Sequence, residues 1–362
     1  MTNSSTQVNF ASTKPHFEIL DGLRGVAAIA VVIFHFMEIW VPNPANNFIE
    51  NAYLAVDFFF CLSGFVIAYA YDEKFAKIGI GNFLKMRIIR LHPLVIIGAV
   101  IGLLCFLFDP FSDLYQKYSG NLAAMFLTAC FMIPYPIVPE RYNNLFHLNP
   151  PTWSLFWEYI ANILYAFVLV KVRHKLLWVL VIIAAIALIW EAQAYGNLGG
   201  GWGKDNIPGG GIRMAFSFLA GMLVYRSQWI IRTRLNFIAI SLLLLAAFMV
   251  PYRNAFNAIT HPLIVILYFP FIVALGAGAH LGDRLKAICR FSGNISYPLY
   301  MVHYPFIWWF FSYVQKYKPG MDQIIPIIIV GLIALILFAS AILKWVDVPV
   351  RRWLKNRFAK GL

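Results

Sequence analysis

The first apolar segment, at about residues 22–40, contains ionisable side chains at a spacing that could support chemistry inside a membrane. Asp21 and Arg24 lie at its start, and His35 follows Arg24 by eleven residues. Eleven helical residues make three turns plus about 20°, so Arg24 and His35 share a face about 16 Å apart along the axis. Glu38 comes one turn later, where its carboxylate could orient the imidazole. The alternative is that His35 is a core histidine bonded to a neighbouring helix.

Further polar groups lie at depth in later apolar segments. His303 lies in a segment at 296–314 that two prolines interrupt, and such interruptions usually line a cavity. Glu158 lies in a segment at 152–170, nearer its external end, with Ser154 one turn before it. The alternative for these residues is an interhelical hydrogen bond, and it applies equally to two residues of the second segment, Asp57 and Ser63.

A pair of arginines precedes the third apolar segment. Arg87 and Arg90 are three residues apart and therefore share a helix face. They stand just before His92 and Pro93, on the side that charge counting makes cytoplasmic. One interpretation is contact with lipid headgroups. The other is binding of a cytoplasmic phosphorylated ligand, because the guanidinium fork fits phosphate.

The composition fixes the class of protein. Of 362 residues, 61% are hydrophobic and only 12% are charged, which excludes a soluble enzyme and a disordered chain. The net charge of +13 would suggest nucleic acid in a soluble protein, but in a membrane protein such an excess marks cytoplasmic loops. We therefore expect an all-α, polytopic helical membrane bundle in contact with lipids, with no nucleic-acid partner.

Apolar segments follow one another along the chain with short polar loops between them. Most of them are long enough to cross a hydrocarbon core of about 30 Å. We expect them at about 22–40, 52–71, 93–108, 119–133, 152–170, 176–192, 212–226, 235–250, 262–279, 296–314 and 323–344.

Charge counting indicates that one of these segments does not cross. If the segment at 119–133 stays on one side as a re-entrant or surface helix, 22 of the 29 Lys and Arg residues lie inside and 7 outside. The positive-inside rule favours this arrangement over eleven crossings. It predicts ten transmembrane helices with both termini cytoplasmic. The expected organisation is a disordered N-terminus at 1–15, a transmembrane domain at 16–353 and a basic tail at 354–362.

Cysteine spacing gives no sign of a metal site. The four cysteines are scattered and lack a CxxC or other metal-ligand spacing, so no metal is expected.

Six short motifs follow one another along residues 16–353. They are LDGLRG at 20–25 followed by His35, DFFFCLSGF at 57–65, RIIRLHP at 87–93, TWSL at 152–155 with Glu158, ISYPLY at 295–300 with His303 and Pro305, and DVP at 347–349 with Arg351. With these motifs the chain resembles the acyltransferase 3 family of membrane-bound O-acyltransferases. Two mild departures from the family pattern are His92 before Pro93 and Asp347 in the last motif, where Glu is common.

This resemblance implies a function for the residues named above. Family members move an acyl group, often acetyl, from cytoplasmic acyl-CoA to a hydroxyl, so acetyl-CoA is the expected donor and a cell-surface glycan or glycolipid the expected acceptor. His35 would be the catalytic base, or would carry the acyl group, with Glu38 orienting its ring. Arg24, Arg87 and Arg90 would bind the donor. The residues expected to meet substrate, with Glu158, Trp153 and His303 on the acceptor side, are Asp21, Ser63, Trp153, Ser154, Glu158, Tyr300 and His303.

Two other functions fit the same sequence. A transporter or flippase also has many spans, proline-broken helices and ionisable groups at depth. An acyltransferase for a small lipophilic acceptor, such as a macrolide, would share every motif. In each case the expected location is the bacterial inner (plasma) membrane, as a multi-pass protein, and the oligomeric state stays open.

Overall fold

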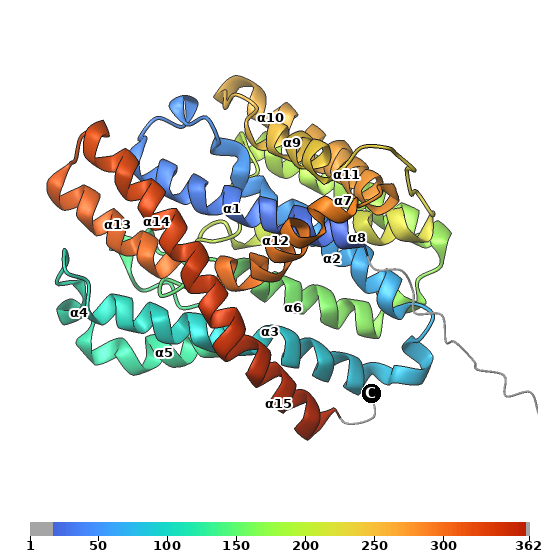
Figure 1. The fold of residues 1–362 in the computed structure, drawn as a ribbon, viewed down its shortest axis with the longest axis horizontal. Helices are drawn as coiled ribbons and strands as arrows, with labels where there is room; N and C mark the ends of the chain where they lie inside the picture. The colour runs from blue at the N-terminus through green and yellow to red at the C-terminus, as the bar shows by residue number, and fades with distance from the viewer. Residues whose placement is uncertain (1–16, 360–362) are drawn as a thin grey trace, which may run out of the picture.

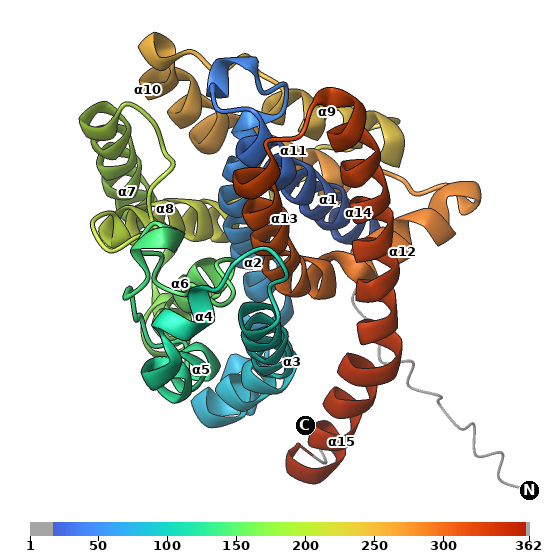
Figure 2. The same cartoon turned by 90° about the vertical axis from the view of Figure 1, so that its left-hand side faces the viewer.

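The structure, a computed structural model, describes residues 17–359 and is all-helical, which confirms the predicted fold class. Within those residues there is no strand, and two isolated bridges join Asn144 to Gly203 and Thr233 to Ala279. Figures 1 and 2 show a bundle in which α1 runs through the middle. The predicted disordered segment at 1–15 lies outside the described residues.

Fifteen α-helices make up the described part of the bundle, and two π-helical turns, Ile264–Tyr268 and Leu343–Asp347, join α10 to α11 and α14 to α15. The helices are α1 Glu18–Trp40, α2 Ala55–Tyr71, α3 Phe75–Leu107, α4 Leu114–Lys117, α5 Leu122–Cys130, α6 Thr152–Phe167, α7 His174–Tyr195, α8 Ile207–Arg226, α9 Phe237–Phe248, α10 Asn254–Leu263, α11 Phe269–Gly278, α12 Asp283–Val302, α13 Tyr304–Tyr317, α14 Met321–Ile342 and α15 Val348–Phe358.

Seven helices or joined helices of the described chain are long and apolar enough to cross a membrane, by length and composition. They make the protein a multi-pass membrane bundle. The predicted segments at 119–133 and 235–250 fold as the shorter helices α5 and α9, of 9 and 12 residues. At about 1.5 Å per residue, both helices are shorter than a core of about 30 Å, and α5 is the segment that charge counting predicts not to cross. The predicted segment at 296–314 is divided between α12 and α13 at His303.

The helices that position the polar residues pack with backbones in close approach. A Cβ atom added at Gly25 of α1 would lie 2.1 Å from the carbonyl oxygen of Ser292 in α12. A Cβ atom at Gly221 of α8 would lie 1.8 Å from the carbonyl oxygen of Cys61 in α2. Small residues at such contacts are typical of helix pairs in membranes, where van der Waals packing stabilises association.

Helix α3 begins well before the apolar segment that marks it in the sequence. Gly79, with φ of +74°, forms a kink that divides α3 into a short first helix and a long second one, and the segment at 93–108 is the later part of the second. Pro93 lies inside the helix. Arg87 and Arg90 therefore project from a continuous helix rather than from a loop, which fixes their positions relative to the bundle.

Candidate active site

Helix α1 holds a histidine–carboxylate pair near its C-terminal end. The Nδ1 atom of His35 lies 2.5 Å from Oε1 of Glu38, as their spacing of three residues allows. The side chains are 17% and 32% exposed. Because the carboxylate accepts at Nδ1, the Nε2 atom is the ring nitrogen left to meet a ligand.

A second histidine stacks on the first. The rings of His35 and His303 have centroids 5.4 Å apart and an interplanar angle of 22°, and the ring of Tyr304 meets His35 edge-on at 4.6 Å. His303 stands at the break between α12 and α13, close to Pro298 and Pro305, and is fully buried. Its Nδ1 atom donates to the carbonyl oxygen of Leu299 at 3.0 Å, while Nε2 has no hydrogen-bond partner among residues 17–359. The broken segment thus places a second imidazole beside the pair.

The pair opens into a cavity of about 850 Å³ at the end of the bundle where α1 finishes. Its walls combine aromatic rings with carboxylates and guanidinium groups, and the loops after α1, before α6 and before α8 close it. The charged and aromatic lining residues include Glu38, Glu50, Arg141, Trp153, Glu191, Arg213, Tyr300, Tyr304 and Trp308. A polar cavity with aromatic walls suits a hydroxyl-rich ligand, because aromatic faces offer stacking surfaces and carboxylates accept from hydroxyl groups.

A buried ion pair supports one wall of this cavity. Arg213 of α8 donates to both carboxylate oxygens of Asp57 of α2, at 2.6 to 3.1 Å, and the two side chains are 1% and 0% exposed. The guanidinium carbon also lies 5.3 Å from the ring centre of Trp153. Asp57 thus makes an interhelical bond, one of the two interpretations that its sequence position allowed.

A second cluster lies further toward the N-terminal end of α1. Arg87 of α3 donates to Oε1 of Glu158 of α6 at 2.9 Å, and the hydroxyl of Ser63 donates to the same oxygen at 3.2 Å. Arg24 donates from Nε to the hydroxyl of Ser296 at 2.8 Å and lies 3.3 Å from Asp21. The charges of Arg87, Arg90 and Glu158 all act on Arg24.

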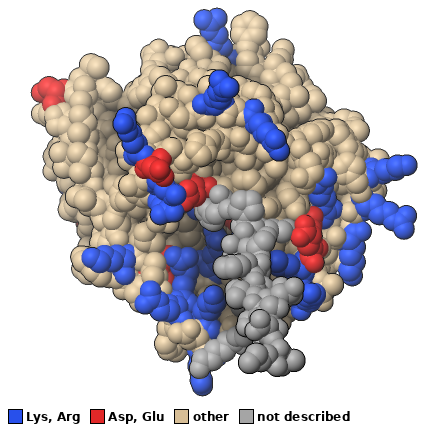
Figure 3. Space-filling view, turned by 45° about the vertical axis from the view of Figure 1, so that its right-hand side comes forward, with Lys and Arg blue, Asp and Glu red and all other residues tan. Residues whose placement is uncertain are grey.

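Basic side chains gather on the exposed surface of the bundle near this cluster. Arg90 is exposed on α3, and α15, which packs on α3, exposes further cations along the same end of the bundle. Figure 3 shows that Lys and Arg outnumber Asp and Glu on this face. The exposed basic residues of α3 and α15 are Lys77, Lys85, Arg90, Arg352, Lys355 and Arg357. This end of the molecule is suited to an anionic ligand or to an anionic lipid surface.

The structure divides the predicted substrate residues between the two clusters. Trp153 and Tyr300 line the cavity with His35, and Ser154 bonds the Tyr300 hydroxyl at 2.8 Å. Glu158, expected on the acceptor side with Trp153, bonds Arg87 of α3, which is the interhelical bond that its alternative interpretation predicted. The reason is the direction of α6: Glu158 is five residues beyond Trp153, so it lies deeper in the bundle.

Sequence reasoning missed several cavity residues. Arg213 had a detectable signal, since it stands at the edge of a predicted span with Asp57 at a similar depth in another. Glu191 lies at the end of the predicted segment at 176–192, where a charged residue is ordinary. Glu50 and Arg141 gave no signal, because each lies in a polar stretch between apolar segments. Folding of the loops over α1 brings Glu50 and Arg141 to the cavity that Glu191 of α7 also lines.

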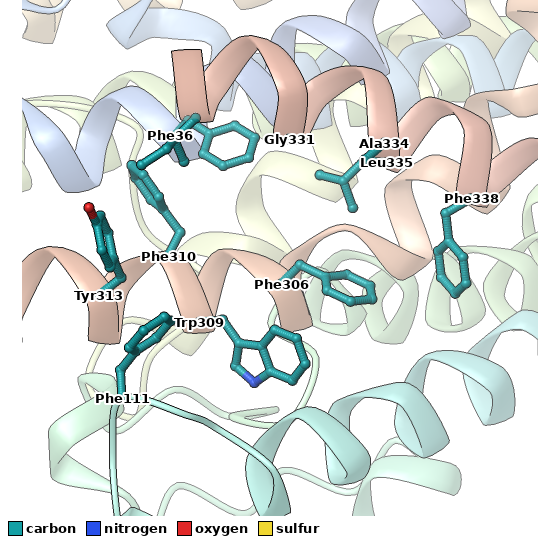
Figure 4. A pocket seen from close by; sticks show the side chains of 11 residues that line it. Phe36, Phe111, Phe306, Trp309, Phe310, Tyr313, Gly331, Ala334, Leu335 and Phe338 are labelled. Carbon is teal, nitrogen blue, oxygen red and sulfur yellow. The ribbon is translucent and has the colours of Figure 1, made fainter. Parts of the chain in front are cut away.

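A second pocket, of about 630 Å³, lies on the opposite face of α13. Figure 4 shows Phe306, Trp309 and Phe310 of α13, which line it together with Leu335 and Phe338 of α14. The same helix turns Tyr304 and Trp308 toward the polar cavity. Helix α13 therefore separates a polar pocket from an apolar groove.

Metal ligation has no support in the described part of the chain. Residues 17–359 contain no group of three His, Cys, Asp or Glu side chains that could hold a metal ion. All four cysteines are free and buried.

A multi-pass helical bundle with a histidine–carboxylate pair in a polar cavity is the framework of a membrane-embedded enzyme. The chain belongs to the acyltransferase 3 family, since it matches that family's acyltransferase domain over residues 17–345. Nearly all of the described helices fall within the match.

Three relatives illustrate the range of the family. Protein 2 in picA locus of Rhizobium radiobacter is 34% identical over 51% of this chain and 98% of its own length. O-acetyltransferase OatA of Staphylococcus aureus is 27% identical over 43% of this chain and 25% of its own length. Peptidoglycan O-acetyltransferase OatA of Listeria monocytogenes is 22% identical over 92% of this chain and 55% of its own length. The chain thus spans about half of the Listeria protein and a quarter of the Staphylococcus protein. No solved structure matches it.

Proposed function

We propose that the protein is an integral membrane O-acetyltransferase that moves an acetyl group from cytoplasmic acetyl-CoA to a hydroxyl of a cell-surface glycan or glycolipid. The observation that supports this most directly is the His35–Glu38 pair at 2.5 Å inside a polar cavity, at the far end of α1 from the arginine cluster. The relatives named as O-acetyltransferases agree with the choice of acetyl group and of a hydroxyl acceptor.

In the proposed reaction His35 is the general base. With Nδ1–H held by Glu38, Nε2 takes the proton of the acceptor hydroxyl while the oxygen attacks the thioester carbonyl carbon. The carbon–sulfur bond then breaks, and the imidazolium returns its proton to the departing thiolate. Glu38 stabilises the transient imidazolium by its charge. An acetyl-histidine formed first on Nε2 is a variant of the same chemistry.

The donor is proposed to bind at the arginine cluster. Arg90 is exposed on α3 and Arg24 lies at the start of α1, so both can meet the phosphates of CoA. Arg87 already bonds Glu158 and would share the guanidinium between that carboxylate and a phosphate. The thioester arm would then extend along α1 toward His35, over the roughly 16 Å that eleven helical residues span.

The acceptor is proposed to occupy the cavity from the opposite side of the membrane. Trp153 offers a stacking face, and Tyr300 and Glu191 offer polar groups for hydroxyls. In this arrangement both termini are cytoplasmic, the bundle crosses the bacterial inner membrane ten times with the short α9 as one of the crossings, and α5 stays on the outer side.

The test is the acetyl content of surface glycans from host cells lacking the gene and complemented with wild type, His35→Ala or His35→Gln. Mass spectrometry should show the acetyl mass restored by wild type and absent with both variants, each present in the membrane at normal level. His280→Ala is the matched control, because His280 is exposed and distant in sequence from the cavity residues. Full restoration by His35→Ala would remove the catalytic role. No acetyl mass lost on deletion would remove the proposed function and favour transport.

A further inference from the structure

Arg141 is a buried cation that the proposed reaction leaves without a role. It lies in a short helical turn, Pro139–Arg141, within the loops that close the cavity, and it is only 4% exposed. Its Nη1 atom donates to the carbonyl oxygen of His147 at 2.7 Å. Its guanidinium carbon lies 4.7 Å from the ring centres of both Phe106 and Trp308. The two rings fix the guanidinium plane between α3 and α13.

No carboxylate pairs with this guanidinium in the described part of the chain. Asp109 acts on it electrostatically, but that side chain is already bonded to Ser312 and to the backbone amide of Phe111. Burial lowers the pKa of Arg141 to about 9, so the side chain stays positively charged at neutral pH. A buried charge without a partner is costly, and its retention beside a cavity is typical of a ligand site.

The other charges of the cavity do not duplicate it. Arg213 also lines the wall, but Asp57 neutralises it at 2.6 Å. The acidic side chains Glu38, Glu50 and Glu191 offer an anion no attraction, so an anionic group in this cavity would lie near an uncompensated cation. Arg141 is therefore the lining group of the described cavity with positive charge to spare.

The position of Arg141 relative to His35 is set by a chain of rings. The ring centres of Tyr304 and His35 are 4.6 Å apart, and those of Trp308 and Tyr304 are 5.2 Å apart. The guanidinium carbon of Arg141 lies 4.7 Å from the ring centre of Trp308. Arg141 is thus separated from the histidine by two aromatic side chains. At this separation the guanidinium does not reach a carbonyl group that reacts at His35. It can contact a neighbouring part of the same ligand.

We propose that Arg141 binds a carboxylate or phosphate group of the acceptor, so that the acceptor is an acidic glycan or glycolipid whose anionic group lies near the acetylated hydroxyl. This inference rests on the proposed function, because it assumes that the cavity holds the acceptor. Arg141 is a specificity-determining residue in this view, and acyl-CoA binding at the other end of α1 does not depend on it.

The test uses the full chain in host cells deleted for the gene. Arg141→Gln should lower glycan acetylation at least ten-fold, Arg141→Lys should restore a substantial part, and Arg253→Gln should leave it unchanged, since Arg253 is exposed outside the cavity lining. Acetyl-CoA binding to the purified protein should be the same in all four proteins. Mass spectrometry of wild-type cells should find a carboxylate or phosphate in the acetylated repeating unit.

Three results overturn the inference. A repeating unit that is acetylated but has no charged group overturns the inference whatever the variants do. This measurement decides the question even if Arg141→Gln does not reach the membrane. Wild-type acetylation by Arg141→Gln removes it directly. If both Arg141 variants lose acetyl-CoA binding and also lose glycan acetylation, the residue has a structural role instead. Absence of any acetylation in wild-type cells marks failure of the proposed function, and the His35 variants separate that case from the others.

Discussion

The carboxylate of Glu38 and the Nδ1 atom of His35 are joined at 2.5 Å across one turn of α1, within a side-chain pair that faces a polar cavity. This contact fixes both the orientation of the imidazole and the nitrogen that remains available to a ligand. Because an amide cannot stabilise an imidazolium by charge, Glu38→Gln is expected to lower the turnover number by roughly 10²-fold or more. The affinity for acetyl-CoA should not change.

Steady-state acetyl transfer by purified protein in lipid nanodiscs measures this directly. Glu73→Gln is the control, since Glu73 is exposed in the turn between α2 and α3. A turnover number for Glu38→Gln within a factor of two of wild type would contradict the orienting role.

Arg90 is expected to act on the donor and hardly on stability. It is exposed and makes no ion pair within residues 17–359, so Arg90→Gln should leave the melting temperature unchanged. Loss of one charge-assisted hydrogen bond to phosphate costs about 1.5–3 kcal/mol, which corresponds to a KM for acetyl-CoA raised roughly 10- to 100-fold. Lys85→Gln removes an exposed cation from the same helix and serves as the control. Equal KM values for the two variants would point to lipid contact alone.

The Asp57–Arg213 pair is expected to be structural. Both side chains are buried, and Asp57→Asn leaves the guanidinium charge uncompensated. Such a change destabilises a fold by about 3–5 kcal/mol. Thermal unfolding in detergent, followed by loss of monodisperse protein, should therefore shift strongly downward for Asp57→Asn. The exposed Asp322→Asn, at the start of α14, should melt like wild type. Equal melting of the two variants would contradict this account.

The contact between α2 and α8 is expected to tolerate no side chain at Gly221. A Cβ atom there would lie 1.8 Å from the backbone oxygen of Cys61, so the helices must separate to admit one. Gly221→Ala should destabilise the protein by about 1–3 kcal/mol or more. Gly81→Ala on α3 meets nothing within 4 Å and should be neutral or slightly stabilising. Equal levels of both variants in the membrane after heating would show that α2 and α8 can accommodate the added methyl group, which would contradict the prediction.

Much of the fold could be predicted from the sequence because the length of an apolar stretch is enough to predict a membrane helix. The all-α class and most helix positions follow from that signal. The number and lengths of spans follow less well, since α9 is apolar but short, and His303 divides one apolar segment into two helices. Hydropathy averages over such interruptions and cannot detect them.

The candidate site was predictable where one helix carries the residues. The spacing of His35 and Glu38 on α1 implied a contact that the structure contains. Contacts between helices could not be predicted, because periodicity gives the face of a helix but not its neighbour. The contact between Glu158 and Arg87 joins two helices and could not be predicted for this reason. Arg141 reaches the cavity through a loop whose path no pattern in the sequence describes.

The stretch of α1 between Arg24 and His35 has a consequence for the membrane as an electrical barrier. Residues 25–34 are all apolar, and most are buried. A hydrated ion has no polar partner among these side chains, whereas the thioester arm of the proposed donor carries no charge. In the proposed reaction the nucleotide charge stays at one end of α1 while the acetyl group reaches the other. The enzyme can then act across a charged membrane without discharging it.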